Sequence, residues 1–367
     1  MITLQFRALI VAIGMLGVNI AHAQLTIEQL IEQTGIEASD VAMRDMPGWH
    51  KPRKIIVLDR FGFFEEVDGT VSGVELVAVR SEADAIAQAA DADAIIGFCA
   101  GRVVSAAPKV MWVQIFSAGA EHCLTVDQIR SEQVILTNMQ KMSSPVIAEH
   151  VMAMTLALAR GLPQFSKTMP QGKWLRGPGM TDGMQTVAGK TMLVVGLGGI
   201  GTEVARRAAA LDMRVIGTRR SSREGPDFVD YVGLSDELHE LAGQADFIVN
   251  ALPLTPATTG LFDQQFFAAA KRGTHFINVG RGRTVVTDDL VAALRDGMVA
   301  GAGLDVTDPE PLPADHPLWQ FDNVIITPHV AGRGANRVRH RMLAIENLRR
   351  FVAGDALLNV VNPNLGY

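Results

Sequence analysis

Three side chains late in the sequence have the chemistry needed to reduce a carbonyl group or to oxidise an alcohol. Arg281 carries a guanidinium that can stabilise negative charge developing on a carbonyl oxygen. His329 belongs to the residue type that exchanges protons near neutral pH, and the carboxylate of Glu310 could stabilise its charged form. Taken singly, each could instead belong to a structural ion pair, and His329 could be a histidine of the buried core. Their occurrence in one ordered series favours catalysis.

Each of these three residues follows a segment that is predicted to be a strand. In an open sheet of parallel strands, ligands bind at the carboxyl ends of the strands. The sequence therefore places Arg281, Glu310 and His329 at one edge of one sheet. The three strands are expected over His275–Asn278, Gly301–Leu304 and Val324–Ile326.

A glycine-rich turn opens the same part of the chain. The apolar run Met192–Val195 passes into a G-x-G-x-x-G pattern, a helix is expected over Thr202–Leu211, and a second strand over Arg214–Gly217. In this context such a turn binds a dinucleotide, because exposed N–H groups and the helix dipole hold the pyrophosphate. A glycine-rich turn without a ligand is the alternative. The turn comprises Gly196, Leu197, Gly198, Gly199, Ile200 and Gly201.

The end of the second strand predicts which dinucleotide binds. A site for NAD has an acidic residue there, which accepts a hydrogen bond from the ribose 2′-hydroxyl. This chain has Thr218, Arg219, Arg220 and Ser221, with no acid. Two guanidinium groups and a hydroxyl suit a 2′-phosphate, so NADP(H) is favoured over NAD(H). The alternative is a solvated basic loop.

Apolar runs alternate with helical segments along the chain after residue 50. Such runs, when helices separate them, predict parallel sheets covered on both faces. The predicted fold is α/β with two doubly wound domains: a flavodoxin-like substrate domain, residues 50–150 plus 334–367, and a Rossmann NAD(P)-binding domain, residues 151–333. A long apolar helix over Ser144–Arg160 is expected to be buried between domains or subunits. The other strands are expected over Lys54–Leu58, Val74–Val79, Ala94–Gly97, Val113–Ile115, Val134–Thr137 and Phe247–Asn250.

The order of these motifs resembles the D-isomer-specific 2-hydroxyacid dehydrogenase family, and the similarity covers residues 54–361. It rests on the glycine-rich turn and on the segments Asn278–Gly282, Leu304–Pro311 and Thr327–His329. The resemblance implies reduction of a small 2-oxo acid, such as glyoxylate or hydroxypyruvate, to the D-2-hydroxy acid. It also implies a homodimer and an active site between the two domains.

The resemblance implies roles for individual residues. Arg281 would hold the substrate carboxylate and polarise the 2-oxo group. His329 would be the general acid in reduction and the base in oxidation, and Glu310 would hydrogen-bond to it. Asp305 would contact the nicotinamide end of the cofactor. The cofactor pocket is expected to be lined by Leu252, Pro253, Val279, Gly280, Arg281 and His329.

The loop after the predicted strand Ala94–Gly97 is expected to bind the substrate. Backbone N–H groups in such a loop can hold a carboxylate, and the resemblance gives this role to Ala100 and Gly101. The neighbouring Cys99 and the second cysteine, Cys123, are expected to be free thiols that behave as small buried hydrophobes. Their spacing does not match a zinc motif, and no metal site is predicted.

The composition limits the class of protein. A length of 367 residues fits two domains, and 48% hydrophobic with 20% charged residues excludes a disordered chain. A net charge of −6 argues against nucleic acid as a partner, because such binding depends on basic surfaces. A small-molecule 2-oxo or 2-hydroxy acid is the expected partner.

Residues 1–23 have the order of a secretory signal peptide. Arg7 precedes the apolar run Ala8–Ile20, and Ala21 and Ala23 occupy the −3 and −1 places of a cleavage site. The run is too short to span a bilayer as a mature helix, so no stable membrane anchor is expected. The predicted location is the periplasm or the cell exterior. A cytoplasmic protein with a later translation start is the alternative.

Two other functions remain open at the level of sequence. A dehydrogenase of another small substrate, such as phosphite or formate, would share the framework, although a formate enzyme would carry Gln in place of Glu310. A non-catalytic nucleotide sensor or corepressor would bind the nucleotide without turnover. The complete set of Arg281, Glu310 and His329 favours an enzyme.

Overall fold

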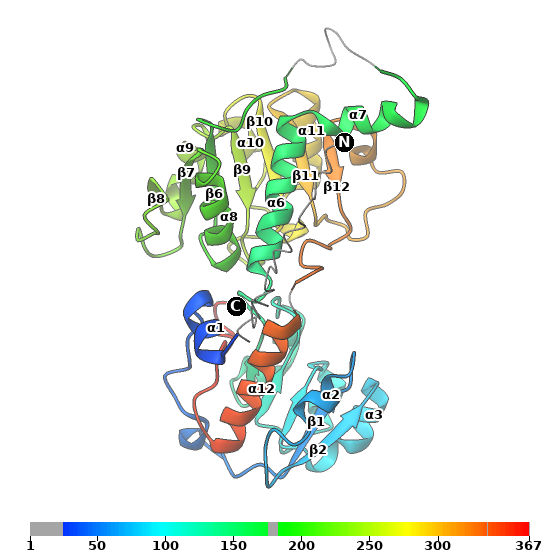
Figure 1. Ribbon diagram of the computed structural model, residues 1–367, viewed down its shortest axis with the longest axis vertical. Coiled ribbons are helices and arrows are strands. Elements are labelled where there is room, and N and C mark those ends of the chain that lie inside the picture. The colour runs from blue at the N-terminus through cyan, green and yellow to red at the C-terminus, as the bar shows by residue number, and fades with distance from the viewer. Residues whose placement is uncertain (1–24, 175–182, 336, 367) are drawn as a thin grey trace, which may run out of the picture.

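The computed structural model describes residues 25–174, 183–335 and 337–366, so the predicted signal peptide lies outside the described residues. The chain forms two α/β domains, one above the other in Figure 1. Within these ranges, no helix combines the length and the apolar character that crossing a membrane requires.

The lower domain in Figure 1 is built on a parallel sheet whose described strands follow the order β2-β1-β3-β4-β5. This is the flavodoxin-like order, as the sequence predicted. Ile55, Ile56 and Val57 of β1 are fully buried, which is typical of a strand covered on both faces. The strands are β1 (Lys54–Leu58), β2 (Glu75–Val79), β3 (Ala94–Ile96), β4 (Trp112–Gln114) and β5 (Ile135–Thr137). The helices between them are α2 (Phe63–Val67), α3 (Glu82–Gln88), α4 (Gly101–Ser105) and α5 (Asp127–Arg130).

The helices nearest the two ends of the described chain pack in the lower domain. Helix α1 (Ile27–Thr34) begins at a capping box made by Thr26 and Gln29, which satisfies its first N–H groups. Helix α12 (Arg337–Ala353) returns from the upper domain and buries Phe351 against Trp112, with ring centroids 5.0 Å apart. The last helix therefore completes the core of the first sheet.

The upper domain contains a larger parallel sheet, whose described strands follow the order β12-β11-β10-β9-β6-β7-β8. The sequence predicted six of these strands and missed β8 (Tyr231–Gly233), which has three residues and lies at the sheet edge. A strand so short carries little periodic signal. The other strands are β6 (Thr191–Val195), β7 (Arg214–Thr218), β9 (Phe247–Asn250), β10 (Thr274–Asn278), β11 (Val299–Leu304) and β12 (Val324–Ile326).

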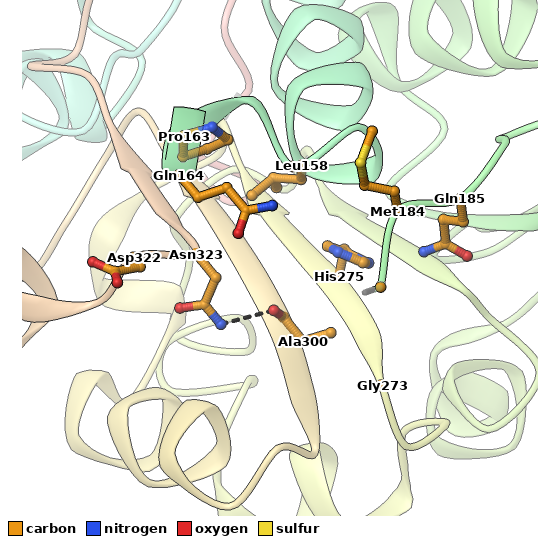
Figure 2. A pocket seen from close by; sticks show the side chains of 12 residues that line it. Leu158, Pro163, Gln164, Met184, Gln185, Gly273, His275, Ala300, Asp322 and Asn323 are labelled. Atoms are coloured by element: carbon orange, nitrogen blue, oxygen red, sulfur yellow. Dashed lines mark hydrogen bonds between the residues drawn. The ribbon is translucent and has the colours of Figure 1, made fainter. Parts of the chain in front are cut away.

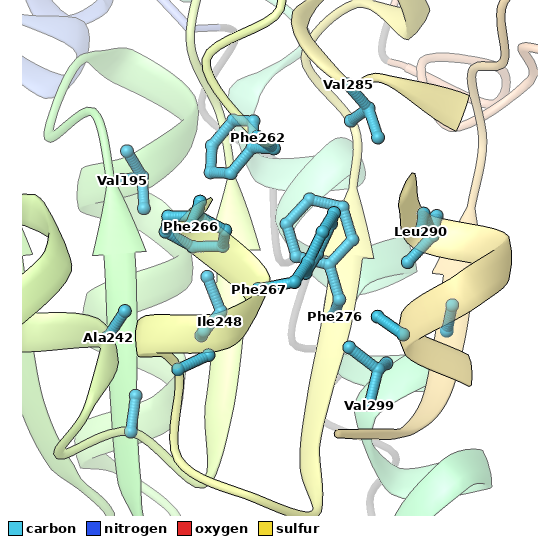
Figure 3. Packing of buried hydrophobic residues seen from close by; sticks show 14 of the residues in the cluster. Val195, Ala242, Ile248, Phe262, Phe266, Phe267, Phe276, Val285, Leu290 and Val299 are labelled. Carbon is cyan, nitrogen blue, oxygen red and sulfur yellow. The ribbon is translucent and has the colours of Figure 1, made fainter. Parts of the chain in front are cut away.

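Helices cover both faces of this sheet. On one face, three phenylalanine rings pack against one another in edge-to-face or tilted orientations, with centroids 4.8 to 6.5 Å apart (Figure 3). They belong to Phe262, Phe266 and Phe276. On the other face, Met154 packs so closely that a Cβ on Gly303 would lie 2.8 Å from its sulfur. The face with the phenylalanine rings is covered by α9 (Leu238–Ala242), α10 (Gln264–Ala269) and α11 (Thr287–Arg295). The face with Met154 is covered by α6 (Ser144–Ala159) and α8 (Gly199–Ala209). Helix α7 (Leu162–Thr168) follows α6.

Candidate active site

Three loops at the carboxyl edge of the upper sheet carry the residues that the sequence singled out. Arg281 follows β10, Glu310 follows β11 and His329 follows β12, and these three strands are neighbours. His329 Nδ1 lies 2.8 Å from Glu310 Oε1. Their side chains are 48% and 44% exposed, so a dissolved substrate can reach this pair.

Asp305 organises the turn that carries His329. Its carboxylate accepts hydrogen bonds from the backbone N–H groups of Val330 (2.8 Å) and Ala331 (3.0 Å) and from the hydroxyl of Thr327 (2.6 Å). The His329 N–H donates to the Asp305 carbonyl at 2.8 Å, and His329 adopts a left-handed φ of +54°. The buried carboxylate, expected at the nicotinamide, thus lies inside the turn and fixes the backbone of the histidine.

The loop of Arg281 is held by buried polar side chains whose roles the sequence did not reveal. Asn278 Oδ1 accepts from the Gly280 N–H at 3.0 Å and from Asn250 Nδ2 at 2.9 Å. Thr284 Oγ1 donates to the Arg281 carbonyl at 2.6 Å. Buried polar groups that are fully hydrogen-bonded restrain the backbone around them. The network therefore fixes the backbone position from which the Arg281 side chain extends.

The guanidinium of Arg281 reaches the other domain. Its Nε lies 2.8 Å from Glu121 Oε1, and its Nη1 donates to the Gly280 carbonyl at 2.8 Å. A Cβ on Gly119 would lie 2.0 Å from Nη2, so only glycine leaves room for the guanidinium. The sequence analysis assigned no role to Glu121.

The predicted substrate loop follows β3 of the lower sheet. Gly97 has a φ of +109°, and a Cβ there would lie 2.4 Å from the Leu58 Cβ, so the tight turn requires glycine. Ala100 precedes α4 as its N-cap residue, and Gly101 is the first residue of that helix. Both lie at the carboxyl edge of the lower sheet, because α4 follows the carboxyl end of β3.

The expectation of free thiols was wrong, because Cys99 and Cys123 form a disulfide with a Cα–Cα separation of 5.3 Å. Their loops follow β3 and β4, which are adjacent strands, and so meet at one edge of the sheet. A sequence separation of 24 residues gave no sign of this. The bond ties the loop of Ala100 to the turn that carries Glu121.

The glycine-rich turn has the geometry that a dinucleotide requires. Gly196 has a φ of +95°, and a Cβ on Gly201 would lie 2.0 Å from the Gly196 carbonyl oxygen, so the helix packs directly on the turn. Apart from Gly198 and its two chain neighbours, no heavy atom of the described residues lies within 4 Å of the position a Cβ would take on Gly198, which leaves space for a phosphate. The Gly196 N–H donates to the Thr218 hydroxyl at 3.2 Å, which links the turn to β7.

The residues predicted to line the cofactor pocket lie beside this turn. The Leu252 side chain faces Gly196, where a Cβ would lie 2.9 Å from its Cδ2. A Cβ on Gly280 would lie 2.6 Å from the Leu252 carbonyl oxygen, so the loops after β9 and β10 touch. Pro253 continues the first loop, and Val279 is buried in the second.

The end of β7 supplies positive charge. Arg219 forms no ion pair with the described residues, and its Nε is buried without a hydrogen-bond partner among them. Arg220 and Ser221 are exposed beside it. Arg223 pairs with Glu237 at 2.7 Å, and this contact, together with hydrogen bonds from the Leu234 N–H and the Tyr231 hydroxyl, lowers the pKa of Glu237 to about 2. The orphaned Nε of Arg219 and the open space at Gly198 fit a phosphorylated dinucleotide.

A cavity of about 430 Å³ lies elsewhere, at the amino ends of β10 and β11 (Figure 2). His275 and Ala300 line it, and Asn323 Nδ2 donates to the Ala300 carbonyl at 2.7 Å. His275 is buried, and its Nδ1 has no hydrogen-bond partner among the described residues. The catalytic candidates lie at the opposite ends of these strands, so this cavity is separate from them.

These loops define a two-domain, dinucleotide-dependent oxidoreductase framework, and comparison with known proteins agrees. Residues 152–331 match the model for the D-isomer-specific 2-hydroxyacid dehydrogenase NAD-binding domain. The human glyoxylate reductase/hydroxypyruvate reductase is 36% identical over 258 residues, which cover 67% of this chain and 75% of the relative.

Solved structures show the same architecture over most of the chain. A family member from Aeromonas salmonicida has a TM-score of 0.75 at 30% identity, covering 85% of this chain and 99% of its own. The NADPH-dependent glyoxylate/hydroxypyruvate reductase from Sinorhizobium meliloti, solved with NADP and sulfate, has a TM-score of 0.71 at 30% identity, covering 86% and 100%. The chain belongs to the D-isomer-specific 2-hydroxyacid dehydrogenase family. It is an oxidoreductase that acts on CH–OH groups with NAD(P).

Proposed function

We propose that this dehydrogenase reduces a small 2-oxo acid, such as glyoxylate or hydroxypyruvate, to the D-2-hydroxy acid with NADPH. The observation that carries the proposal is the 2.8 Å contact between His329 and Glu310, on loops adjacent to that of Arg281. Relatives named as glyoxylate or hydroxypyruvate reductases support the substrate class.

The side chains divide the chemistry among themselves. When bound, a reduced nicotinamide supplies a hydride to C2 of the substrate. Arg281 binds the substrate carboxylate and stabilises the charge that develops on the 2-oxo oxygen. His329 gives that oxygen a proton, and Glu310 orients the imidazole and stabilises its charged form. Backbone N–H groups at Ala100 and Gly101 hold the carboxylate from the lower domain.

The test is a spectrophotometric assay of purified residues 24–367. NADPH and NADH oxidation would be followed with glyoxylate, hydroxypyruvate, pyruvate and phenylpyruvate, and NADP⁺ reduction with phosphite and formate. Turnover of a 2-oxo acid that His329→Ala abolishes, with NADPH affinity retained, supports the proposal. NADPH binding without any turnover would favour the nucleotide sensor, and reduction of NADP⁺ by phosphite would favour the alternative dehydrogenase.

The preference for NADPH over NADH is supported by the end of β7. Arg219 and Arg220 occupy the positions where an NAD site has an acidic residue. The buried Nε of Arg219 has no hydrogen-bond acceptor among the described residues. Replacing both arginines with Ala should weaken NADPH binding far more than NADH binding. Equal losses for the two cofactors would contradict a role in holding the 2′-phosphate.

We also propose a homodimer that uses the region after α6. Large apolar side chains are exposed there, namely Leu162 of α7 (50%), Met169 (75%) and Trp174 (92%). Exposed apolar surface of this kind is typical of protein interfaces. Light scattering coupled to size exclusion should give twice the chain mass, and Trp174→Ser should lower the dimer fraction.

Export from the cytoplasm is the proposed localisation, and a cytoplasmic protein is the alternative. The Cys99–Cys123 disulfide supports export, because disulfides persist in oxidising compartments and are rare in the cytosol. Fusing residues 1–30 to a reporter should carry it out of the cytoplasm. A reporter that stays inside would overturn the proposal.

A further inference from the structure

Lys141 lies on the segment that carries the chain from β5 of the lower sheet into α6 of the upper domain. The base of its side chain packs against the glycine-rich turn. A Cβ on Gly199 would lie 2.8 Å from Lys141 Cγ and 3.4 Å from its Cα. Gly199 is the first residue of α8, whose leading N–H groups are placed to hold a pyrophosphate. The lysine therefore lies against the amino end of α8, where those N–H groups are.

The backbone of Lys141 is strained. Its φ is +71°, in the left-handed region that a residue with a Cβ rarely adopts. Strain of this kind concentrates at ligand clamps and active sites, where a side chain must point in one direction. The conformation places the base of the lysine side chain beside Gly199.

The ammonium group is anchored without being neutralised. Nζ donates a hydrogen bond to the carbonyl of Gly35, the C-cap residue of α1. Within the described part of the chain, no carboxylate forms an ion pair with this lysine. An ammonium carries three N–H donors, so the contact with Gly35 leaves capacity for other acceptors.

The surroundings of Lys141 favour an anion. Burial and the positive charge of Arg219 lower the pKa of Lys141, and the carboxylate of Glu37 acts in the opposite sense. The Glu37 carboxylate offsets part of the positive charge of Lys141 and Arg219, and a bound anion would offset more of it. The phosphate groups of a dinucleotide are such an anion, and Gly198 leaves open space beside the turn.

Building on the proposed function, we propose that Lys141 binds the pyrophosphate of the dinucleotide from the substrate-domain side. The glycine-rich turn then supplies N–H donors from one side and Lys141 supplies a positive charge from the other. Because Gly35 holds Nζ in place, little side-chain entropy is lost when the pyrophosphate binds.

The test compares the affinities of NADPH, NADH and adenosine for the wild type and for Lys141→Met, measured by calorimetry. Losing a charge-assisted contact should weaken NADPH and NADH by about tenfold or more, and by similar factors, while adenosine is unaffected. Lys141→Arg should retain most of the affinity. The matched control is Lys109→Met, which removes an exposed lysine far from the turn and should change nothing.

Lys141→Gly separates binding from folding. Glycine tolerates the positive φ, so urea unfolding should show stability at least equal to that of the wild type, while the dinucleotide affinity falls as in Lys141→Met. Affinities within twofold of the wild type, or a loss confined to NADPH, would overturn the assignment to the pyrophosphate. A wild type that binds neither NADPH nor NADH would instead overturn the proposed function, and this inference with it.

Discussion

Arg281 and Glu121 join the two domains through a hydrogen-bonded ion pair in which Nε lies 2.8 Å from Oε1. The arginine follows β10 of the upper sheet, and the glutamate follows β4 of the lower sheet. Holding Nε from one side fixes the plane of the guanidinium and leaves Nη2 for another acceptor. Glu121 therefore orients the group that is proposed to bind the substrate carboxylate.

Glu121→Gln should impair substrate use without weakening NADPH binding. The change keeps an acceptor at this position but removes the charge that holds the guanidinium. A hydrogen bond to a charged group contributes about 1.5–3 kcal/mol, so kcat/KM for the 2-oxo acid should fall about 10- to 100-fold. Steady-state kinetics and NADPH calorimetry would measure the two effects.

The exposed Glu65, in the same domain, provides the matched control, and Glu65→Gln should leave kcat/KM unchanged. Gly119→Ala tests the same geometry differently, because its Cβ would lie 2.0 Å from Arg281 Nη2 and must displace the guanidinium. Its loss in kcat/KM should exceed that of Glu121→Gln. Wild-type kinetics in either variant would show that substrate use does not depend on the orientation that Glu121 gives to the Arg281 guanidinium.

Asp305→Asn distinguishes two roles for a buried carboxylate. If Asp305 acts by fixing the turn of His329, an amide in its place loses at least one of three accepted hydrogen bonds and misplaces the histidine. The kcat should then fall by about 100-fold or more, with NADPH affinity little changed. A weaker NADPH affinity with kcat retained would instead support contact with the nicotinamide. Asp288→Asn, at an exposed acid, is the control.

The sequence predicted the two sheets because their strands are compact apolar runs. Lys54–Leu58 and Met192–Val195 are buried on both faces, and helices separate such runs throughout. The glycine-rich turn was equally clear, because its spacing reflects the positive φ of Gly196 and the packing of Gly201. His329 and Glu310 could be proposed as site residues because each follows a strand of that pattern.

Contacts between distant segments left no local signal. Glu121 meets Arg281 across 160 positions, and Cys99 meets Cys123 because β3 and β4 are neighbours, a fact of topology rather than of spacing. The left-handed backbone of Lys141 is also invisible in the sequence, where lysine gives no sign of a turn. Such relationships depend on how the sheets are assembled.

Removing the disulfide should destabilise the lower domain. The Cys99–Cys123 bond closes a loop with a sequence separation of 24 residues, and a bond of this kind contributes about 2–4 kcal/mol to the free energy of unfolding. Urea unfolding of Cys99→Ala/Cys123→Ala should show a loss of this size, and dithiothreitol should have no further effect on the variant. If the free energy of unfolding of the wild type is the same with and without dithiothreitol, the disulfide contributes nothing to stability.

Acid should destabilise the protein through His275. Burial lowers the pKa of this side chain to about 4, and its ring stacks on Phe247 with centroids 5.0 Å apart. The unfolded chain, with an ordinary histidine pKa of about 6.5, binds this proton first as the pH falls. Between pH 6.5 and 4 the unfolded state therefore carries more protons, and stability decreases toward acid by up to about 3 kcal/mol.

His275→Phe isolates this contribution because phenylalanine preserves the stack on Phe247 and cannot titrate. The free energy of unfolding of the variant should decline less than that of the wild type between pH 6.5 and 4, whereas the two curves should run parallel above pH 7. The exposed His239→Gln serves as a control for a histidine outside the cavity. Parallel curves over the whole range would mean that His275 titrates equally in the folded and unfolded states, and that water reaches its ring through the neighbouring cavity.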